Sequence, residues 1–455
     1  MEKSLETQIM DKKIIKNLFV SLAVIFVGMS AMASPDRIVK NAVKKADISK
    51  TALISVSFKE IGSDKTVVDY NSKLPMSVAS VQKIVTTIPA LDKLGGEYKF
   101  ETKLFKKNKD LYIKLGADPY LTSRTLRYMV KDLGNYKISA LDNVYIDDSI
   151  TDRIEWGEGW QWDNTLNNFM PKFGAYNIDN NRLDVVIRPT KADALAEIYT
   201  TEFYPIVFKN EVLTGNVTKL SFNSRDYMQP DVIEVSGTVC VKTEKKIPIN
   251  DLRKYFILRL KDSFKKNKIS YYGKFQRASV PSDAVLVAKS ESNVNRVVSD
   301  IMQNSDNMKS ETLFKVAGGG STNSAIEMFK NYYQSRNIDI DGVKITDASG
   351  VSKNNLLNAN FITDVLVNDY NNPNSIKNYM AVPGVGTLQN RMFYLKDRLN
   401  AKTGTLQNVS AIAGYLTAES GKEYAFCIII NDGKSSDFDK KSFEEYVIRT
   451  VYEAL

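Results

Sequence analysis

The chain has 455 residues, enough for two or three domains, and it contains no histidine. A Ser-His-Asp triad and a His-ligated zinc site are therefore excluded, and a serine acyl-transfer enzyme built on this chain needs a lysine as its base. The net charge of +9 is spread along the chain and not gathered in a basic arm, which argues against nucleic-acid binding and suits attraction to an anionic polymer such as a cell wall.

The first 33 residues have the pattern of a signal peptide preceded by a short extension. A basic segment, residues 10–16, is followed by an apolar run, residues 18–29, and by the small-x-small cleavage site Ala31-Met-Ala33. The apolar run of about 12 residues is short for a bilayer span, although an uncleaved membrane anchor is the alternative. The mature chain is expected to begin near Ser34, outside the cytoplasmic membrane, in the periplasm or at the cell wall.

Both ends of the remaining chain have patterns typical of an α/β (α+β) domain. Alternating apolar residues predict a hairpin from residues 51–59 and 65–70, and an apolar face predicts a helix over residues 80–94. Pro89 lies within that helix and is expected to kink or break it. Two more strands and a closing helix are predicted at residues 410–417, 424–431 and 442–455. We therefore predict one domain, an antiparallel sheet with flanking helices, made from the two chain ends.

Residues 101–289 differ from these ends and are predicted to form one or two inserted β-rich domains. Short apolar runs predict strands at residues 111–115, 144–146, 183–187, 232–241 and 284–287. Helices are expected near residues 123–134 and 251–266. Cys240 and Cys427 both lie in strand-like apolar runs, so buried free thiols are expected, although an exported protein could also pair them in a disulfide.

A Ser-x-x-Lys string occurs twice, and its surroundings distinguish the two copies. Ser80 and Lys83 open the predicted helix, where backbone N–H groups and the helix dipole favour a developing oxyanion and the lysine lies one turn further on the same face. Ser263 and Lys266 lie in a charged stretch that predicts a solvated helix face. The first copy is the candidate nucleophile and base, and its alternative interpretation is an N-cap serine with a surface lysine.

Two further motifs follow in chain order. Ser305-Asp-Asn307 is one of several Ser-x-Asn strings, and it is preferred because it interrupts two predicted helices, residues 294–303 and 308–316. Lys402-Thr-Gly404 occurs once, just before an apolar strand, where its glycine is expected to let a substrate backbone come close. Together the three motifs can supply a nucleophile, a base, a proton-relaying hydroxyl, an amide and a cation for a substrate carboxylate.

With these motifs the chain resembles the penicillin-recognising serine D,D-peptidases, specifically the low-molecular-mass class C penicillin-binding proteins with carboxypeptidase and endopeptidase activity. The long gap between Ser80 and Ser305 matches the large insert of this class. The other matching segments are residues 75–83, 116–121, 146–149, 305–311, 349–352, 383–388 and 401–407. The resemblance implies a D,D-peptidase domain with the serine β-lactamase-like fold, formed by residues 34–100 and 290–455 around the insert 101–289.

The resemblance also implies a role for each motif residue. The catalytic residues would be Ser80 as nucleophile, Lys83 as its base and Ser305. The substrate-binding residues of the second and third motifs would be Asn307, Lys402, Thr403 and Thr405. The backbone N–H groups of Ser80 and Thr405 would form the oxyanion hole.

Further residues are implied to contact the side-chain end of the substrate. These would be Gln407 and an aspartate of the insert, Asp147 or, less favoured, Asp148. Lys353 stands where the family often has arginine, so bidentate recognition of a carboxylate would be lost there. Gly116-Ala117 replaces a usual glycine pair. The change at Lys353 bears on fine substrate preference and not on the chemistry.

The resulting hypothesis is a two-step acyl transfer on peptidoglycan stem peptides that end in D-Ala-D-Ala. Lys83 has to be neutral, and we expect burial and the nearby Lys402 ammonium to lower its pKa, while Lys402 stays charged and holds the terminal carboxylate. A β-lactam is expected to acylate Ser80 and, without a recognisable carboxylate for deacylation, to form a long-lived adduct. The alternatives are a β-lactamase-like hydrolase and a non-catalytic cell-wall-binding protein.

The sequence predicts neither a cofactor nor a metal site. Gly318-Gly-Gly320 lacks the lysine of a phosphate loop and is predicted to start a helix. Asp147-Asp148 has no evident third ligand, so substrate contact or surface charge is the interpretation of this pair.

Overall fold

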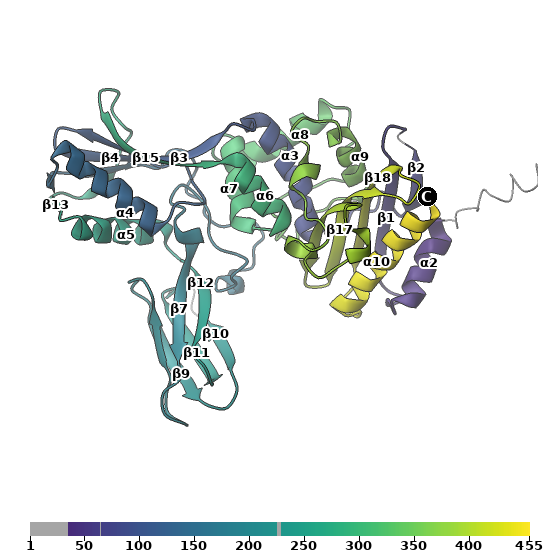
Figure 1. Ribbon diagram of the computed structural model, residues 1–455, viewed down its shortest axis with the longest axis horizontal. Helices are drawn as coiled ribbons and strands as arrows, with labels where there is room; N and C mark the ends of the chain where they lie inside the picture. The colour runs from purple at the N-terminus through teal and green to yellow at the C-terminus, as the bar shows by residue number, and fades with distance from the viewer. Residues whose placement is uncertain (1–34, 64, 225–228) are drawn as a thin grey trace, which may run out of the picture.

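The computed structural model describes residues 35–63, 65–224 and 229–455. The predicted signal peptide, residues 1–33, lies outside these ranges. Among the described helices, none combines the length and the apolar character that a membrane crossing requires. A body of sheet and helices lies at one end of the molecule, and the inserted region extends away from it (Figure 1).

The body is built on a five-stranded antiparallel sheet whose strands come from both chain ends. In spatial order these are β16 (Leu399–Leu406), β17 (Val409–Thr417), β18 (Glu423–Asn431), β1 (Leu53–Glu60) and β2 (Thr66–Tyr70). β1 pairs with β18 along its whole length, so that Leu53 lies opposite Asn431 and Glu60 opposite Tyr424. This pairing confirms the predicted fold class, and the predicted hairpin and strand pair are both present.

Helices cover both faces of this sheet. They are α2 (Pro35–Lys45), α10 (Asp437–Ala454) and α9 (Ala359–Asp369). α2 and α10 pack side by side on one face, over Ile412 and Phe426 (Figure 1). α9 packs on the other face, over the alternate positions Ala413 and Cys427. Because successive side chains of a strand point to opposite faces, β17 and β18 need continuous apolar runs to fill both layers.

A second group of helices packs around α3 (Gln82–Leu94), the helix that follows Ser80. The others are α6 (Val294–Gln303), α7 (Asn307–Ala317) and α8 (Thr322–Gln334). α8 begins just after the three glycines, as predicted, with the Ser321 side chain accepting a hydrogen bond from the N–H of Ser324.

α3 continues through Pro89 from Gln82 to Leu94, so the helix is not broken there, and the expected kink stays a prediction. Proline has no N–H, and the carbonyl of Val85, four residues earlier, therefore loses its helical donor. The hydroxyl of Tyr333 in α8 donates to that carbonyl at 2.8 Å. A side chain of a neighbouring helix thus satisfies the acceptor that proline leaves open.

Replacing Tyr333 by Phe is expected to lower the free energy of unfolding by about 1–3 kcal/mol, because the buried Val85 carbonyl is left without a donor. Denaturant unfolding measures this loss. Tyr332→Phe is the matched control, since Tyr332 is adjacent in α8 and its hydroxyl has no hydrogen bond to the described residues. Equal losses in both variants would contradict the assignment.

The insert contains a five-stranded mixed sheet and two helices, on the left of Figure 1. Its strands in spatial order are β14 (Phe275–Arg277), β6 (Val144–Asp147), β4 (Asp110–Lys114), β3 (Lys99–Lys107) and β15 (Val285–Asn293). The helices are α4 (Ser123–Lys131) and α5 (Leu252–Lys266), and a short pair is formed by β5 (Ala140–Leu141) and β13 (Ser270–Tyr271). β3 and β15 pair antiparallel, so the predicted boundaries of the insert fall inside these two strands.

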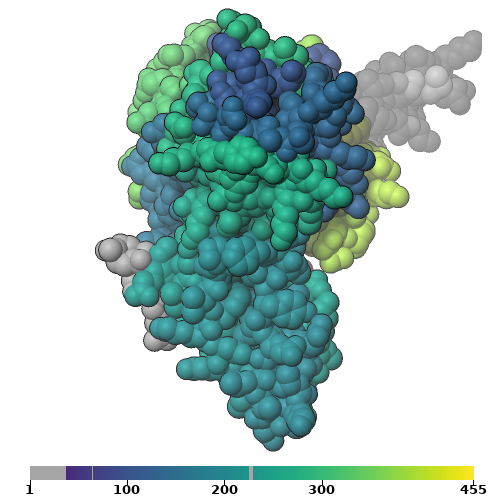
Figure 2. All heavy atoms as spheres, turned by 90° about the vertical axis from the view of Figure 1, so that its left-hand side faces the viewer, coloured from purple at the N-terminus to yellow at the C-terminus, as the bar shows by residue number. Residues whose placement is uncertain are grey.

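Two three-stranded sheets project from the insert (Figures 1 and 2). One contains β12 (Thr243–Pro248), β7 (Arg182–Arg188) and β8 (Glu197–Thr200). The other contains β10 (Lys219–Asn223), β11 (Val232–Val239) and β9 (Val207–Thr214). The projection forms a narrow extension of the molecule in Figure 2.

The two cysteines are free thiols in different environments. Cys427 is buried in β18, as predicted. Cys240 is exposed, so the expectation of burial is wrong for this residue. It directly follows β11, and the alternation of the strand directs it away from the side on which Val239 is buried.

Candidate active site

Ser80 lies in a 3₁₀ turn, η1 (Ala79–Val81), that leads into α3. The preceding residue, Ala79, has a φ of 47°. A non-glycine residue in this left-handed region costs about 1–2 kcal/mol, and such strain is concentrated at functional sites. The turn leaves Ser80 half-buried at the positive end of the helix dipole, where the sequence predicts it.

Lys83 lies one helical turn after Ser80 and is completely buried. Its Nζ lies 2.9 Å from Ser80 Oγ. The same Nζ contacts Asn307 Oδ1 and the carbonyl oxygen of Ser349, each at 2.6 Å. A neutral amine can accept the hydroxyl proton of Ser80 over the first contact, while the other two hold the amine in place.

Burial lowers the pKa of Lys83 to about 8. Three nearby carboxylates raise it in part, those of Asp347, Glu311 and Asp306. Roughly one-tenth of an amine with this pKa is neutral at pH 7, and the neutral fraction grows as the pH rises. Lys83 therefore has both the geometry and the titration range of a general base.

The second motif lies between α6 and α7. Ser305 has a φ of 60°, and its hydroxyl makes no hydrogen bond with the residues that the structure describes. The Asp306 side chain accepts from the N–H of Lys309 and caps α7, so Asn307 becomes the first residue of that helix. Asn307 uses Oδ1 for Lys83 and donates from Nδ2 to the carbonyl oxygen of Phe169 at 2.7 Å.

The third motif lies on β16, which runs beside the turn that holds Ser80. A Cβ atom on Gly404 would lie 2.6 Å from the carbonyl oxygen of Val78 and 3.0 Å from the nitrogen of Ser80. The glycine thus accommodates the turn that holds Ser80, and the expected approach of a substrate backbone stays a prediction. Thr403 is half-buried and Thr405 is exposed along the same strand.

Lys402 is completely buried, and its Nζ donates to the carbonyl oxygen of Thr403 at 2.8 Å. Burial, and next the charge of Lys83, lower the pKa of Lys402 well below its ordinary value. Lys402 is not among the groups that shift the pKa of Lys83, so the expected lowering by its ammonium is absent. The physical reason is that carboxylates support the charge of Lys83, whereas none offsets the desolvation of Lys402 among the described residues.

Two buried carboxylates bind the loop whose Ser349 carbonyl oxygen contacts Lys83. Glu311 of α7 accepts the N–H groups of Ala348 and Ser349, the latter at 2.8 Å. Asp347 accepts the N–H groups of Gly350 at 2.9 Å and Ser352 at 2.7 Å. Burial and the nearby Asp347 raise the pKa of Glu311 to about 7.

Sequence reasoning gave neither carboxylate a role, although Glu311 stands in a segment that carries the family resemblance. Only the fold shows that both side chains bind backbone N–H groups of one loop. That loop supplies the Ser349 carbonyl to Lys83, so the two carboxylates belong to the surroundings of the candidate base.

A pocket of about 200 Å³ lies beside the end of β16. It brings together Lys353 and Gln407, and their contact with the side-chain end of the substrate stays a prediction. The loop of the insert contributes the opposite set of lining residues, among them Gln161, Asn164 and Met170, which sequence reasoning missed.

Asp147 and Asp148 do not line this pocket. Asp147 ends β6 in the sheet of the insert and accepts hydrogen bonds from the N–H and the hydroxyl of Ser149. Asp148 binds the Tyr176 hydroxyl at 2.9 Å and the Arg277 guanidinium at 2.6 Å. The structure therefore does not bring the predicted aspartate to Lys353 and Gln407, because β6 is held between β4 and β14.

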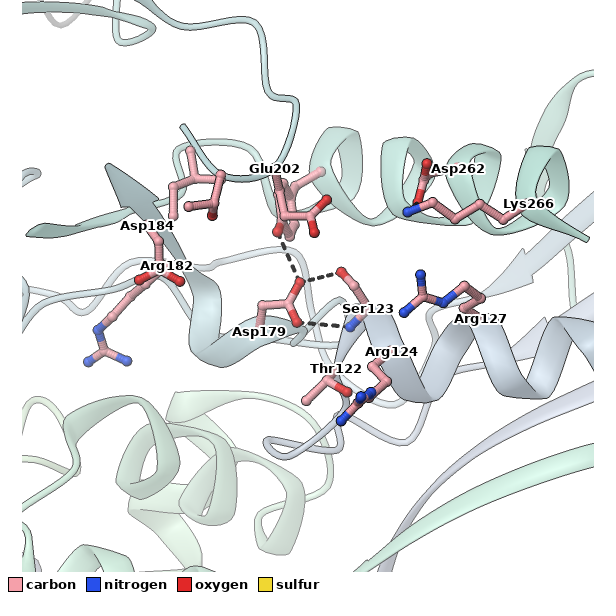
Figure 3. A pocket seen from close by; sticks show the side chains of 13 residues that line it. Thr122, Ser123, Arg124, Arg127, Asp179, Arg182, Asp184, Glu202, Asp262 and Lys266 are labelled. Atoms are coloured by element: carbon pink, nitrogen blue, oxygen red, sulfur yellow. Dashed lines mark hydrogen bonds and ion pairs between the residues drawn. The ribbon is translucent and has the colours of Figure 1, made fainter. Parts of the chain in front are cut away.

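The second Ser-x-x-Lys copy lies in α5, near a pocket of about 270 Å³ in the insert (Figure 3). Lys266 lines that pocket and pairs with Asp262. Ser263 is buried, contrary to the expected solvated face, and its hydroxyl donates to the carbonyl oxygen of Arg259 at 2.8 Å. No residue of the three motifs lines this pocket, and its central carboxylate, Asp179, caps the start of α4 through Ser123 (Figure 3).

The family model described as the D-Ala-D-Ala carboxypeptidase 3 (S13) family matches residues 38–451. This chain belongs to that family. It is a serine-type D-Ala-D-Ala carboxypeptidase.

Two curated relatives of this chain are named as D-alanyl-D-alanine carboxypeptidases. D-alanyl-D-alanine carboxypeptidase DacB of Haemophilus influenzae is 26% identical over 426 residues, which cover 84% of this chain and 86% of the relative. A D-alanyl-D-alanine carboxypeptidase of Actinomadura sp. is 23% identical over 399 residues, 78% of this chain and 73% of the relative.

Solved structures of the same fold include penicillin binding protein 4 of H. influenzae. Its crystal structure has a TM-score of 0.82 and 23% identity, and the match covers 91% of this chain and 99% of that chain. The same protein complexed with a β-lactam has a TM-score of 0.77 and 22% identity, with the same coverage. The similarity extends through the insert, since it covers nearly the whole of both chains.

Proposed function

We propose that Ser80 is the nucleophile and Lys83 the general base of this S13 enzyme, acting on peptidoglycan stem peptides that end in D-Ala-D-Ala. The observation that carries the proposal is the 2.9 Å contact between Lys83 Nζ and Ser80 Oγ, made by a completely buried amine. Ser80 attacks the carbonyl between the two D-alanines, its proton passes to Lys83, and the acyl-enzyme forms as the terminal D-alanine leaves.

The remaining motif residues bind and orient the substrate. Lys402 and Thr403 receive the terminal carboxylate, whose negative charge stabilises the protonated form of Lys402. The hydroxyl of Ser305 relays the proton to the leaving amine, and Asn307 binds a substrate amide. The N–H groups of Ser80 and Thr405 stabilise the oxyanion, and one such donor contributes about 3 kcal/mol to transition-state stabilisation.

The pocket beside β16 receives the side chain of the stem peptide. Lys353 and the amide of Gln407 offer a cation and a hydrogen-bonding group at its rim. These groups suit a side chain that carries a carboxylate or another polar end. A substrate of this kind lies outside the cytoplasmic membrane, in agreement with the signal peptide that residues 1–33 predict.

A β-lactam carries a strained amide and a carboxylate in the positions of D-Ala-D-Ala, so it acylates Ser80. Among the described residues no carboxylate bonds directly to Ser80 or to the Lys83 amine. Glu311 uses its oxygens for two backbone N–H groups of the loop. The acyl-enzyme is therefore expected to persist, unlike that of a β-lactamase.

Labelling with a fluorescent penicillin, followed by the mass of the modified peptide, tests the proposal. We expect a stable adduct on the peptide that contains Ser80. Release of D-alanine from a pentapeptide and cleavage of a cross-linked dimer then measure the carboxypeptidase and endopeptidase activities. Absence of label would favour a non-catalytic wall-binding protein, and rapid release of hydrolysed penicillin would favour a β-lactamase.

A further inference from the structure

Residues 156–173 of the insert, here called the inserted loop, form hydrogen bonds with the surroundings of Lys83. The indole N–H of Trp160 donates to Asp347 Oδ2 at 2.8 Å. The carbonyl oxygen of Phe169 accepts from Asn307 Nδ2 at 2.7 Å. These two hydrogen bonds join the inserted loop to Asn307, which contacts Lys83, and to Asp347, whose charge raises the pKa of Lys83.

Packing fixes the inserted loop in this position. Trp160, Met170 and Phe173 form a buried cluster with Met308, the residue after Asn307 in α7. The rings of Trp160 and Phe173 lie 5.7 Å apart at an angle of 62°, and those of Trp156 and Trp160 lie 5.1 Å apart. Edge-to-face ring pairs of this kind stabilise a loop beyond the area that they bury.

Asp347 connects the inserted loop with the helix of the nucleophile. Besides the indole of Trp160, its carboxylate binds the side-chain amides of Gln82 in α3, at 3.2 Å, and Asn355, at 2.8 Å. It also binds two backbone N–H groups of the loop that presents the Ser349 carbonyl to Lys83. A displacement of this carboxylate would therefore move the carbonyl that holds the amine.

We propose that Trp160 is a positioning residue for Lys83, acting through Asp347. The inserted loop then controls two of the three oxygen atoms around the amine: Ser349 O through Asp347, and Asn307 Oδ1 through the Phe169 carbonyl. The inference rests on the proposed function, because it assigns Trp160 to the base of that reaction. It makes the insert a part of the catalytic site and not only a wall of the substrate pocket.

The charges around Lys83 give this contact a measurable consequence. Asp347, Glu311 and Asp306 raise the pKa of Lys83, and the charge of Lys83 in turn lowers the pKa of Lys402. The positive end of the Trp160 N–H dipole points at the Asp347 carboxylate and partly offsets the negative charge that acts on Lys83. Without that donor, the carboxylate beside Lys83 is less screened, and the pKa of Lys83 rises.

The test is the rate constant of acylation at saturating penicillin, measured against pH in the full-length protein. Trp160→Phe keeps an aromatic ring and removes only the N–H donor with part of the ring. We expect the rate constant to fall about tenfold, the effect of losing one hydrogen bond to a charged group. We also expect the midpoint of the pH–rate profile to move to higher pH.

Two tryptophans of the inserted loop provide matched controls. Trp156 donates its indole N–H to the carbonyl oxygen of Trp160 and not to a carboxylate, and Trp162 is 64% exposed. Trp156→Phe and Trp162→Phe should both keep the wild-type midpoint. An unchanged profile in Trp160→Phe, a fall in rate without a shift of its midpoint, or an equal shift in Trp156→Phe would overturn the inference.

Asp347→Asn tests the same contact if Trp160→Phe does not fold. Removing the negative charge should move the midpoint to lower pH, and an unchanged midpoint would overturn the inference. Wild-type protein that takes no label on Ser80 would overturn the proposed function together with this inference. A labelled wild type with an unaffected Trp160→Phe variant would overturn this inference alone.

Discussion

Replacing Ser80 by Ala is expected to abolish covalent labelling by penicillin and to lower D-alanine release by about a millionfold or to the detection limit. The variant keeps the binding groups on β16 but has no oxygen to form the acyl-enzyme, and losing a serine nucleophile alone costs an enzyme this much. Gel fluorescence and D-alanine release measure the two losses. Ser80 lies half-buried at the helix start, so its replacement should leave the thermal unfolding midpoint near the wild-type value.

Ser263→Ala is the matched control, because Ser263 and Lys266 repeat the Ser-x-x-Lys string. Ser263 donates to a carbonyl within α5, so its loss affects local packing and not acyl transfer. This variant should label like the wild type. Persistent labelling of Ser80→Ala, or loss of labelling in Ser263→Ala, would contradict the assignment of the nucleophile.

Replacing Lys83 by Ala is expected to lower the acylation rate by about 10²–10⁴-fold, the usual contribution of a general base. In the wild type the neutral amine is the active form, so the rate should rise with pH up to about 8 and level off above it. Below that value each pH unit should change the rate about tenfold, because the neutral fraction changes by that factor. Stopped-flow acylation at saturating β-lactam measures the profile.

The Lys83→Ala variant should lose this rise, since no other amine contacts Ser80 Oγ among the described residues. Lys266→Ala, the lysine of the repeated string, should retain both the rate and the profile. A wild-type rate that falls as the pH rises towards 8, or a Lys83→Ala rate within tenfold of the wild type, would exclude Lys83 as the base.

The structure places two buried lysines at one site and gives them different surroundings. Three carboxylates support the charge of Lys83, whereas Lys402 has only a carbonyl oxygen as its partner among the described residues. Lys402 is therefore the amine that gains most from an incoming carboxylate. This difference supports the proposal that Lys402 receives the terminal carboxylate of the substrate.

The sequence by itself determined the features that depend on short-range spacing. Ser80 and Lys83 are three residues apart at a helix start, so any helix there brings their side chains to one face. Apolar runs long enough to fill both faces predicted β17 and β18, and the order of the three motifs indicated the family. The absence of histidine left lysine as the candidate base for a serine nucleophile.

Only the tertiary structure decided which distant groups surround these residues. Trp160, Phe169 and Asp347 are separated by up to 187 residues, and nothing in their local sequence states that they meet beside Lys83. The same holds for Asp147, which β-sheet pairing keeps away from the pocket that Lys353 and Gln407 line, and for the hydroxyl of Tyr333, which binds the carbonyl left open by Pro89. The pKa values of Lys83 and Lys402 also depend on the tertiary structure, because remote segments of the chain bury these amines and thereby desolvate them.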